Sequence, residues 1–126
     1  MPSGSSVIDH VLLVVRDLGA SRRFYEAALR PLGFTIMYEE EDGVAFGTEG
    51  HDDFAVYQGD NPSTRAHVAF TASGRDAVDA FYAAAMANGG RENAAPSIRQ
   101  EYHAGYYAGF VFDPEGNNIE AVFHDR

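Results

Sequence analysis

The chain contains an internal repeat, and this repeat constrains the fold more than any single motif does. The segment Ile8-Asp9-His10-Val11, followed by Phe24-Tyr25 and Gly33, recurs 57 residues later as Ala66-His67-Val68-Ala69, Phe81-Tyr82 and Gly90. A repeat of this length corresponds to one supersecondary unit per copy. Each copy places a histidine near the middle of an apolar strand, and two symmetry-related imidazoles can converge on one point.

The composition favours one hydrophobic core shared by both copies. The chain has 126 residues and a mass of 13.7 kDa, and 45% of its residues are hydrophobic. A chain of this size can bury one core but hardly two independent ones. We therefore expect a single domain over residues 1–126, built from two modules at about residues 7–59 and 65–124 and joined by the linker-like segment Gly59 to Thr64.

Charge and residue content exclude several classes of function. A net charge of -10 and a pI near 4.7 would repel a phosphate backbone, so we expect no nucleic-acid partner. No apolar stretch approaches the roughly 18 residues of a membrane span, and the N-terminus lacks a signal pattern, which predicts no membrane partner and a cytoplasmic protein. With no cysteine, only histidine and carboxylate remain as strong metal ligands.

Hydrophobic periodicity predicts the same order of elements in both modules. In the first we expect a strand over 7–15, a helix over 19–32 capped by Asp17, and strands over 34–38, 43–47 and 53–59. In the second we expect a strand over 66–71, a helix opened by a capping box at Ser73 and Asp76, and strands over 107–113 and 118–124. Residues 91–100 show no regular pattern, and Asp113-Pro114-Glu115-Gly116-Asn117 is typical of a hairpin turn.

Three polar residues lie within apolar strands and indicate a metal site. Glu120 lies mid-strand beside Ile119 and Ala121, where an unpaired carboxylate is costly unless it is wet, protonated or metal-bound. His10 and His67 have comparable surroundings. A lone strand histidine is more often a hydrogen-bonded core residue, but the matched positions in the repeat favour convergence. Two histidines and a carboxylate can hold a divalent metal and leave coordination positions open for substrate or water.

The same residues carry a resemblance to a known family. The segments Ile8-Asp9-His10-Val11, Phe24-Tyr25, Leu32-Gly33-Phe34, Ala66-His67-Val68-Ala69-Phe70 and Phe112 to Glu120 resemble the vicinal oxygen chelate superfamily, which includes glyoxalase I, bleomycin and fosfomycin resistance proteins and extradiol dioxygenases. The resemblance implies an α+β fold in which two βαβββ modules form a curved eight-stranded mixed sheet around a cavity. It also implies a homodimer and one divalent metal per site, either Zn, Fe, Mn, Co or Ni, bound by His10, His67 and Glu120.

One position departs from the family pattern. Members that act on α-dicarbonyl compounds typically have a fourth ligand, often glutamate, on the last strand of the first module. In this chain we expect Phe54, Val56 and Gln58 to point inward there, and no carboxylate lies at the centre of the strand. The three remaining ligands match the two-histidine, one-carboxylate set of extradiol dioxygenases.

Residues 102–107 supply candidates for proton transfer. Tyr102, His103 and Tyr107 can donate, accept or titrate, and they lead into the strand that pairs with that of Glu120, so we assign them as catalytic candidates. The alternative is that their rings pack around the rim of the cavity. We expect His51 and His124 to be solvated surface residues.

The sequence and the resemblance together favour a metal-dependent lyase or isomerase. Its substrate would be a small molecule that chelates the metal through two adjacent oxygens, and proton transfer would accompany charge stabilisation by the metal. One alternative is a ring-cleaving dioxygenase of the extradiol type. Another is a non-catalytic small-molecule binding protein like the bleomycin resistance proteins, and a third is a structural or regulatory subunit with a vestigial site.

Overall fold

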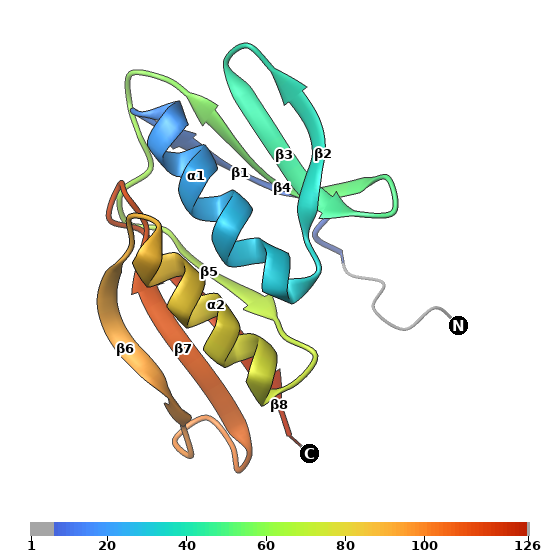
Figure 1. Ribbon diagram of the computed structural model, residues 1–126, viewed down its shortest axis with the longest axis vertical. Helices are drawn as coiled ribbons and strands as arrows, with labels where there is room; N and C mark the ends of the chain where they lie inside the picture. The colour runs from blue at the N-terminus through green and yellow to red at the C-terminus, as the bar shows by residue number, and fades with distance from the viewer. Residues whose placement is uncertain (1–6, 126) are drawn as a thin grey trace.

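The computed structural model describes residues 7–125, which form two modules of the order strand, helix and three strands (Figure 1). This confirms the predicted α+β fold class. The first module contains β1 (Val11–Val15), α1 (Leu18–Leu29), a single 3-10 turn η1 (Arg30–Leu32), β2 (Thr35–Glu40), β3 (Gly43–Thr48) and β4 (His51–Gln58). The second contains β5 (His67–Thr71), α2 (Arg75–Ala87), β6 (Arg91–Ile98), β7 (Tyr106–Phe112) and β8 (Asn118–His124).

The strands form two separate four-stranded sheets, which corrects the prediction of one curved eight-stranded sheet. The first sheet has the order β1-β4-β3-β2 and the second the order β5-β8-β7-β6. In each sheet the first strand of the module runs parallel to the last strand, and the other pairs are antiparallel. Among the described residues, β1 pairs only with β4 and β5 only with β8. Both are therefore edge strands.

Each sheet has one face that packs on the helices, which we call the helix-side face, and a second that we call the open face. Alternate side chains of a strand point to opposite faces. Leu13 and Val15 of β1 are buried on the helix-side face, whereas Leu12 on the open face is 47% exposed. In β5, Phe70 is buried on the helix-side face and His67 is exposed on the open face.

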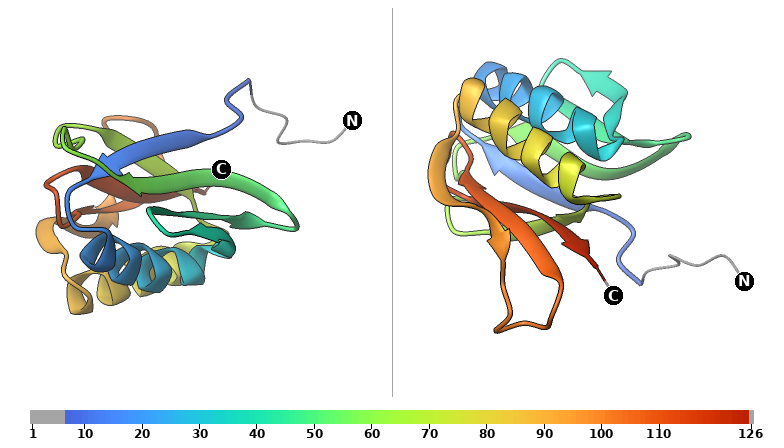
Figure 2. Two further views of the ribbon diagram at one scale, coloured as in Figure 1. Left: turned by 90° about the horizontal axis from the view of Figure 1, so that it is seen from above. Right: turned by 60° about the horizontal axis from the view of Figure 1, so that its bottom comes forward.

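The two modules pack through their helix-side faces. α1 and α2 contact each other and form one layer beside the strands (Figures 1 and 2). The rings of Phe34 and Phe54 lie 5.8 Å and 5.2 Å from the ring of Phe70 in the other module. Buried side chains of both modules form one hydrophobic cluster. The two sheets therefore share one core on their helix-side faces, and each sheet keeps its own open face.

A buried hydrogen-bond network fixes the second hairpin turn against the first module. The Asp113 carboxylate accepts hydrogen bonds from the backbone N–H groups of Glu115 and Asn117 at 2.9 and 2.8 Å. It also accepts one from the Tyr25 hydroxyl of α1 at 2.5 Å. Burial, and then the Asp113 charge, raise the pKa of Tyr25 well above its ordinary value. The predicted turn at 113–117 therefore also joins the modules.

Three local predictions differ from the structure. Residues 91–98 form β6, although its pairing with β7 is interrupted by two register shifts around Ala94 and Ser97, with Pro96 between them. No capping box opens α2, because its N-cap is Gly74 and has no side-chain cap. The first strand begins at Val11, where its pairing with Phe54 begins. The predicted Asp17 cap of α1 is confirmed, since its carboxylate accepts the Ala20 N–H.

Neither α1 nor α2, the helices within residues 7–125, is long and apolar enough to cross a membrane.

Candidate functional site

The open face of the second sheet brings His67 and Glu120 together. The Nε2 atom of His67 on β5 lies 2.8 Å from Oε1 of Glu120 on β8. The two strands pair in parallel, with Ala69 opposite Glu120, which places both side chains on the same face. Glu120 is only 2% exposed, whereas the His67 side chain is 51% exposed. A buried carboxylate is thus paired with an imidazole that solvent or a ligand can reach.

Tyr106 holds the second oxygen of the Glu120 carboxylate. Its hydroxyl donates a hydrogen bond of 2.5 Å to Oε2 of Glu120. Burial, followed by the hydrogen bond to Glu120, raises the pKa of Tyr106 above its ordinary value. The hydroxyl therefore remains protonated at neutral pH and acts as a donor. This arrangement leaves Oε1 as the carboxylate oxygen that faces His67.

Beside this pair lie an apolar floor and two arginines. The floor is the small buried cluster of Ala108 and Phe110 of β7 and Val122 of β8 on the open face. The guanidinium carbon of Arg99 lies 5.0 Å from the centre of the Phe110 ring, and that of Arg91 lies 5.3 Å from the centre of the Phe112 ring. The floor is thus nearly covered, and the arginines place positive charge over the rings at its side.

The three predicted catalytic residues occupy different places. Tyr107 lies on the helix-side face of β7, and its hydroxyl donates a 2.6 Å hydrogen bond to Asp79. His103 lies near the pair, with its ring centre 5.4 Å from that of Tyr106. Tyr102 packs on the same ring at 4.7 Å. The structure thus brings His103 and Tyr102 toward Glu120 and directs Tyr107 away from it.

His124 is solvent-exposed, as expected, and its ring contacts that of His103. Its Nδ1 atom lies 2.9 Å from Nε2 of His103, and the two rings are stacked with centres 5.2 Å apart. Like Tyr106, it lies on the open face with Glu120, because Tyr106 pairs with His124 and Phe110 with Glu120. Sequence reasoning missed the contact of Tyr106 with Glu120.

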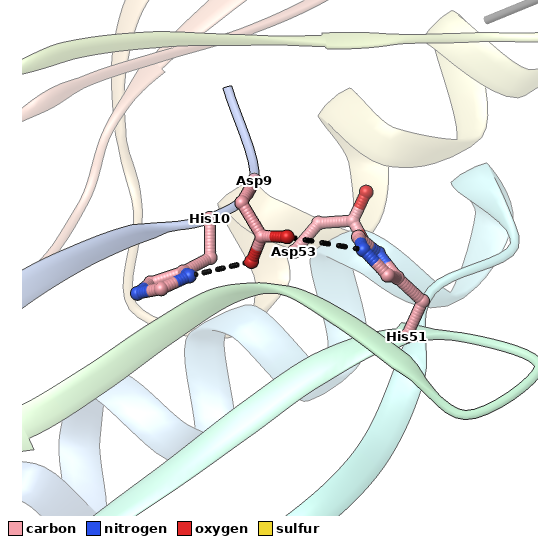
Figure 3. Close-up of polar contacts among 4 residues, drawn as sticks. All are labelled: Asp9, His10, His51 and Asp53. Atoms are coloured by element: carbon pink, nitrogen blue, oxygen red, sulfur yellow. Dashed lines mark hydrogen bonds and ion pairs between the residues drawn. The ribbon is translucent and has the colours of Figure 1, made fainter. Parts of the chain in front are cut away.

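His10 lies on the other sheet, in a separate polar cluster that Figure 3 shows. Its Nδ1 atom is 2.8 Å from a carboxylate oxygen of Asp9, and the other Asp9 oxygen is 3.7 Å from Nε2 of His51. His51 in turn lies 2.5 Å from Asp53 through Nδ1. The hydrogen bond to His10 lowers the pKa of Asp9, and the hydrogen bond to Asp53 raises that of His51. All four residues are solvent-exposed or partly so, and the Nε2 atom of His10 is the ring nitrogen not engaged by Asp9.

The centre of β4 carries no ionisable side chain on the open face. Phe54 and Val56, which we expected to point inward, are buried on the helix-side face. The open-face residue is Ala55, which pairs with Leu12 of β1 in the way that Glu120 pairs with Ala69 of β5. The prediction that this strand lacks a central carboxylate therefore agrees with the structure, but the residue that replaces it is Ala55.

The structure brings together two of the three predicted metal ligands. Within residues 7–125, no three His, Cys, Asp or Glu side chains are grouped so that they could hold a metal ion. His67 and Glu120 provide a nitrogen and an oxygen donor of the kinds that divalent transition metals prefer. His10 directly precedes β1 of the first sheet and, within residues 7–125, is not grouped with this pair. His67 and Glu120 form one half-site and His10 forms the other. The three donors fit such a metal only where two half-sites meet.

A separate pocket of about 690 Å³ lies between the edge strands β1 and β5. Its walls are mostly apolar residues of the helix-side faces, among them Leu13, Phe34, Phe54, Val68 and Phe70. His67 lines it, but Glu120 does not. The pocket is therefore lined by one member of the His67 and Glu120 pair.

Comparison with known proteins identifies the family. Residues 7–121 match the model of the Glyoxalase/Bleomycin resistance protein/Dioxygenase superfamily. The match covers most of the chain, and the chain belongs to this superfamily, as the resemblance predicted. A search of the curated proteins found no significant relative.

Solved structures of similar proteins share the fold. A glyoxalase/bleomycin resistance protein from Albidiferax ferrireducens is 29% identical with a TM-score of 0.84, and the alignment covers 94% of this chain and 99% of that one. A glyoxalase-related enzyme from Fulvimarina pelagi is 19% identical, with a TM-score of 0.73 and coverage of 94% and 88%. A family enzyme from Burkholderia phytofirmans is 20% identical, with a TM-score of 0.71 and coverage of 94% and 99%. The two structures with lower identity support the fold alone.

Proposed function

We propose that the protein is a homodimeric, metal-dependent lyase or isomerase that acts on a small substrate with two adjacent chelating oxygens. Each site would combine His67 and Glu120 of one chain with His10 of its partner. The observation that carries the proposal is the contact between His67 and the buried Glu120 carboxylate, on an open face that His10 of the same chain does not reach.

The chemistry of the two open faces supports pairing between chains. The open face of the first sheet exposes Leu12 and Tyr38 and carries the carboxylates of Glu40 and Asp53. The open face of the second sheet carries the apolar floor together with Arg91 and Arg99. A two-fold dimer that packs the first sheet of one chain on the second sheet of the other would match acidic with basic groups and cover the apolar side chains.

In such a site, the chain's own residues have distinct roles. A divalent metal bound by His10, His67 and Glu120 would polarise the substrate oxygens and stabilise the negative charge that develops on them. Tyr106 holds Oε2 of Glu120 and thereby orients the carboxylate. His103 is the proposed proton carrier, because an imidazole can both donate and accept a proton and its ring lies beside Tyr106.

Tyr102 packs against Tyr106 and limits its movement. Tyr107 points to the helix-side face, where it bonds Asp79, so this mechanism gives it no role.

The decisive experiment mixes two inactive variants. His10→Ala and Glu120→Ala should each lose bound metal. If the site is shared between chains, unfolding and refolding an equal mixture restores one intact site in each heterodimer, which is about a quarter of all sites. Metal content by elemental analysis, with each variant refolded alone as the control, measures this directly. No recovery in the mixture, or full metal content in either single variant, would contradict the proposal.

A second function is favoured by the pocket between β1 and β5. Its volume of about 690 Å³ and its largely apolar walls suit a small aromatic molecule. In this case the protein would bind a ligand without catalysis, as the bleomycin resistance branch does. Calorimetric titration of metal-free protein with bleomycin separates the two functions, because only the binding protein retains the ligand without metal.

A further inference from the structure

Arg99 lies over the open face of the second sheet with part of its guanidinium group unused. Its backbone N–H donates to the Tyr106 carbonyl at 2.7 Å, which directs the side chain over β7. One terminal nitrogen lies 3.4 Å from the Glu101 carboxylate. The Nε atom is buried, and no group within residues 7–125 accepts a hydrogen bond from it. A buried N–H without a partner costs free energy, so this atom favours a ligand that can accept its hydrogen.

The position of Arg99 relates it directly to the proposed site. Across the second sheet, His67 on β5, Glu120 on β8 and Phe110 on β7 follow one another, and Arg99 directly follows the end of β6 at Ile98. Phe110 pairs with Glu120, and its ring lies 6.2 Å from the His67 ring and 5.0 Å from the Arg99 guanidinium carbon. The Phe110 ring therefore separates the His67 and Glu120 pair from Arg99, and a small molecule that spans this separation would reach the pair with one end and Arg99 with the other.

The charges on this face favour an anionic group at Arg99. The chain as a whole has a net charge of -10, so a substrate anion is repelled unless a local cation attracts it. Glu120 is already bonded by His67 and Tyr106, and Glu101 is an exposed partner of one Arg99 nitrogen. The Nε edge of an arginine presents two parallel N–H donors, and this geometry matches a carboxylate.

We infer that Arg99 binds a carboxylate of the substrate, so that the substrate is a small acid with a second pair of oxygens a few carbons away. This inference rests on the proposed function, because the second pair of oxygens would occupy the site at His67 and Glu120. Arg99 would fix the orientation of the substrate across the Phe110 ring. It would thereby select acids over neutral molecules of the same shape.

The test compares two probe molecules that differ only in the distal carboxylate. 2-Oxoglutarate has it, and 2-oxopentanoate does not. Calorimetric titrations of the dimer, both metal-loaded and metal-free, should give a preference for 2-oxoglutarate of about tenfold or more. In 15N-resolved NMR spectra, 2-oxoglutarate should shift the Nε–H signal of Arg99, and 2-oxopentanoate should leave it in place.

Variants decide which arginine is responsible. Arg99→Gln should abolish the preference and leave the affinity for 2-oxopentanoate within about twofold of wild type. Arg91→Gln, at the matched position over Phe112, should keep the preference. The inference is overturned if the wild-type dimer shows no preference or does not bind 2-oxoglutarate, or if Arg99→Gln keeps the preference. It is also overturned if Arg99→Gln dissociates the dimer in size-exclusion chromatography without changing the preference, because Arg99 is then a contact between subunits.

The two proposals can fail separately. If the protein binds no metal but prefers 2-oxoglutarate through Arg99, the metal-dependent function fails and the carboxylate site stands. If the protein binds metal through His67 and Glu120 but shows no preference, only the role of Arg99 fails.

Discussion

The hydroxyl group of Tyr25 should contribute much more to stability than that of its repeat equivalent, Tyr82. Tyr25 is fully buried and donates to the buried Asp113 carboxylate, thereby linking α1 to the 113–117 turn. Tyr82 is only partly buried, on α2. The substitutions Tyr25→Phe and Tyr82→Phe remove the same atom from equivalent places in the two modules, which makes them a matched pair.

The structure sets the expected size of the effect. A hydrogen bond to a charged group contributes about 1.5–3 kcal/mol, more than one between neutral groups. After Tyr25→Phe, the Asp113 carboxylate still accepts the N–H groups of Glu115 and Asn117, which limits the loss. We therefore expect the free energy of unfolding to fall by about 2 kcal/mol, with a decrease in Tm of roughly 8 °C for a chain of this length. Tyr82→Phe should change it by no more than about 0.5 kcal/mol.

The pH dependence provides an independent check. The pKa of Tyr25 is raised in the folded protein from its ordinary value of 10.0, so the folded state holds this proton more tightly than the unfolded state does. The resulting stability is present below pH 10 and is lost as the pH rises toward the raised pKa. Tyr25→Phe should therefore weaken the decline in stability above pH 10.

Urea unfolding followed by circular dichroism at pH 7 and above pH 10 measures both effects. Equal losses in Tyr25→Phe and Tyr82→Phe at pH 7 would refute the reasoning, because the two hydroxyl groups would then have equivalent environments. An unchanged alkaline decline in Tyr25→Phe would refute the assignment of the raised pKa.

Two further predictions concern the candidate half-sites. Tyr106→Phe should weaken metal binding by about 10–100-fold, because Glu120 loses the hydrogen bond that orients it, while the fold stays intact. Competition with a chromogenic chelator measures this affinity. At the other half-site, the pKa of His51 should lie above its ordinary value of 6.5, because Asp53 stabilises the imidazolium, and Asp53→Asn should lower it. NMR titration of the imidazole signals measures the pKa of His51 in wild type and in Asp53→Asn.

Controls separate these effects from general damage. Tyr107→Phe removes a hydroxyl on the opposite face of the same strand and should leave metal affinity unchanged. Equal metal affinity in wild type and Tyr106→Phe would show that the hydroxyl does not position Glu120. If the titration of His51 is the same with and without Asp53, the ion pair in Figure 3 has no influence on protonation.

The repeat and the turn signals predicted most of the fold because they are encoded locally. The spacing of the two histidines predicted the two modules, and the residues at 113–117 predicted the turn of the last hairpin. The last strand begins at Asn118, as expected. β6 was missed because its register shifts and Pro96 interrupt the alternation of apolar and polar residues. The separation into two sheets was also missed. It depends on contacts between modules, such as that between Phe54 and Phe70, which no local pattern encodes.

At the candidate site, the sequence predicted the contact of two residues but not the full arrangement. His67 and Glu120 lie together as expected. Tyr106 could have been found by counting back from the turn, since even-numbered residues of β7 and β8 share a face when Phe112 pairs with Asn118. The position of Ala55 could not have been found in this way, because the register of β4 against β1 depends on loop lengths that differ between the modules.

The placement of the candidate ligands on two separate sheets has a thermodynamic consequence for a dimer of the proposed kind. A metal held by ligands from two chains binds the dimer and not the separated monomers, so metal binding and subunit association are linked equilibria. Each would strengthen the other by the same factor. Dilution of the protein would then release metal, chelators would promote dissociation, and the amount of active enzyme in a cell would depend on more than the first power of its concentration.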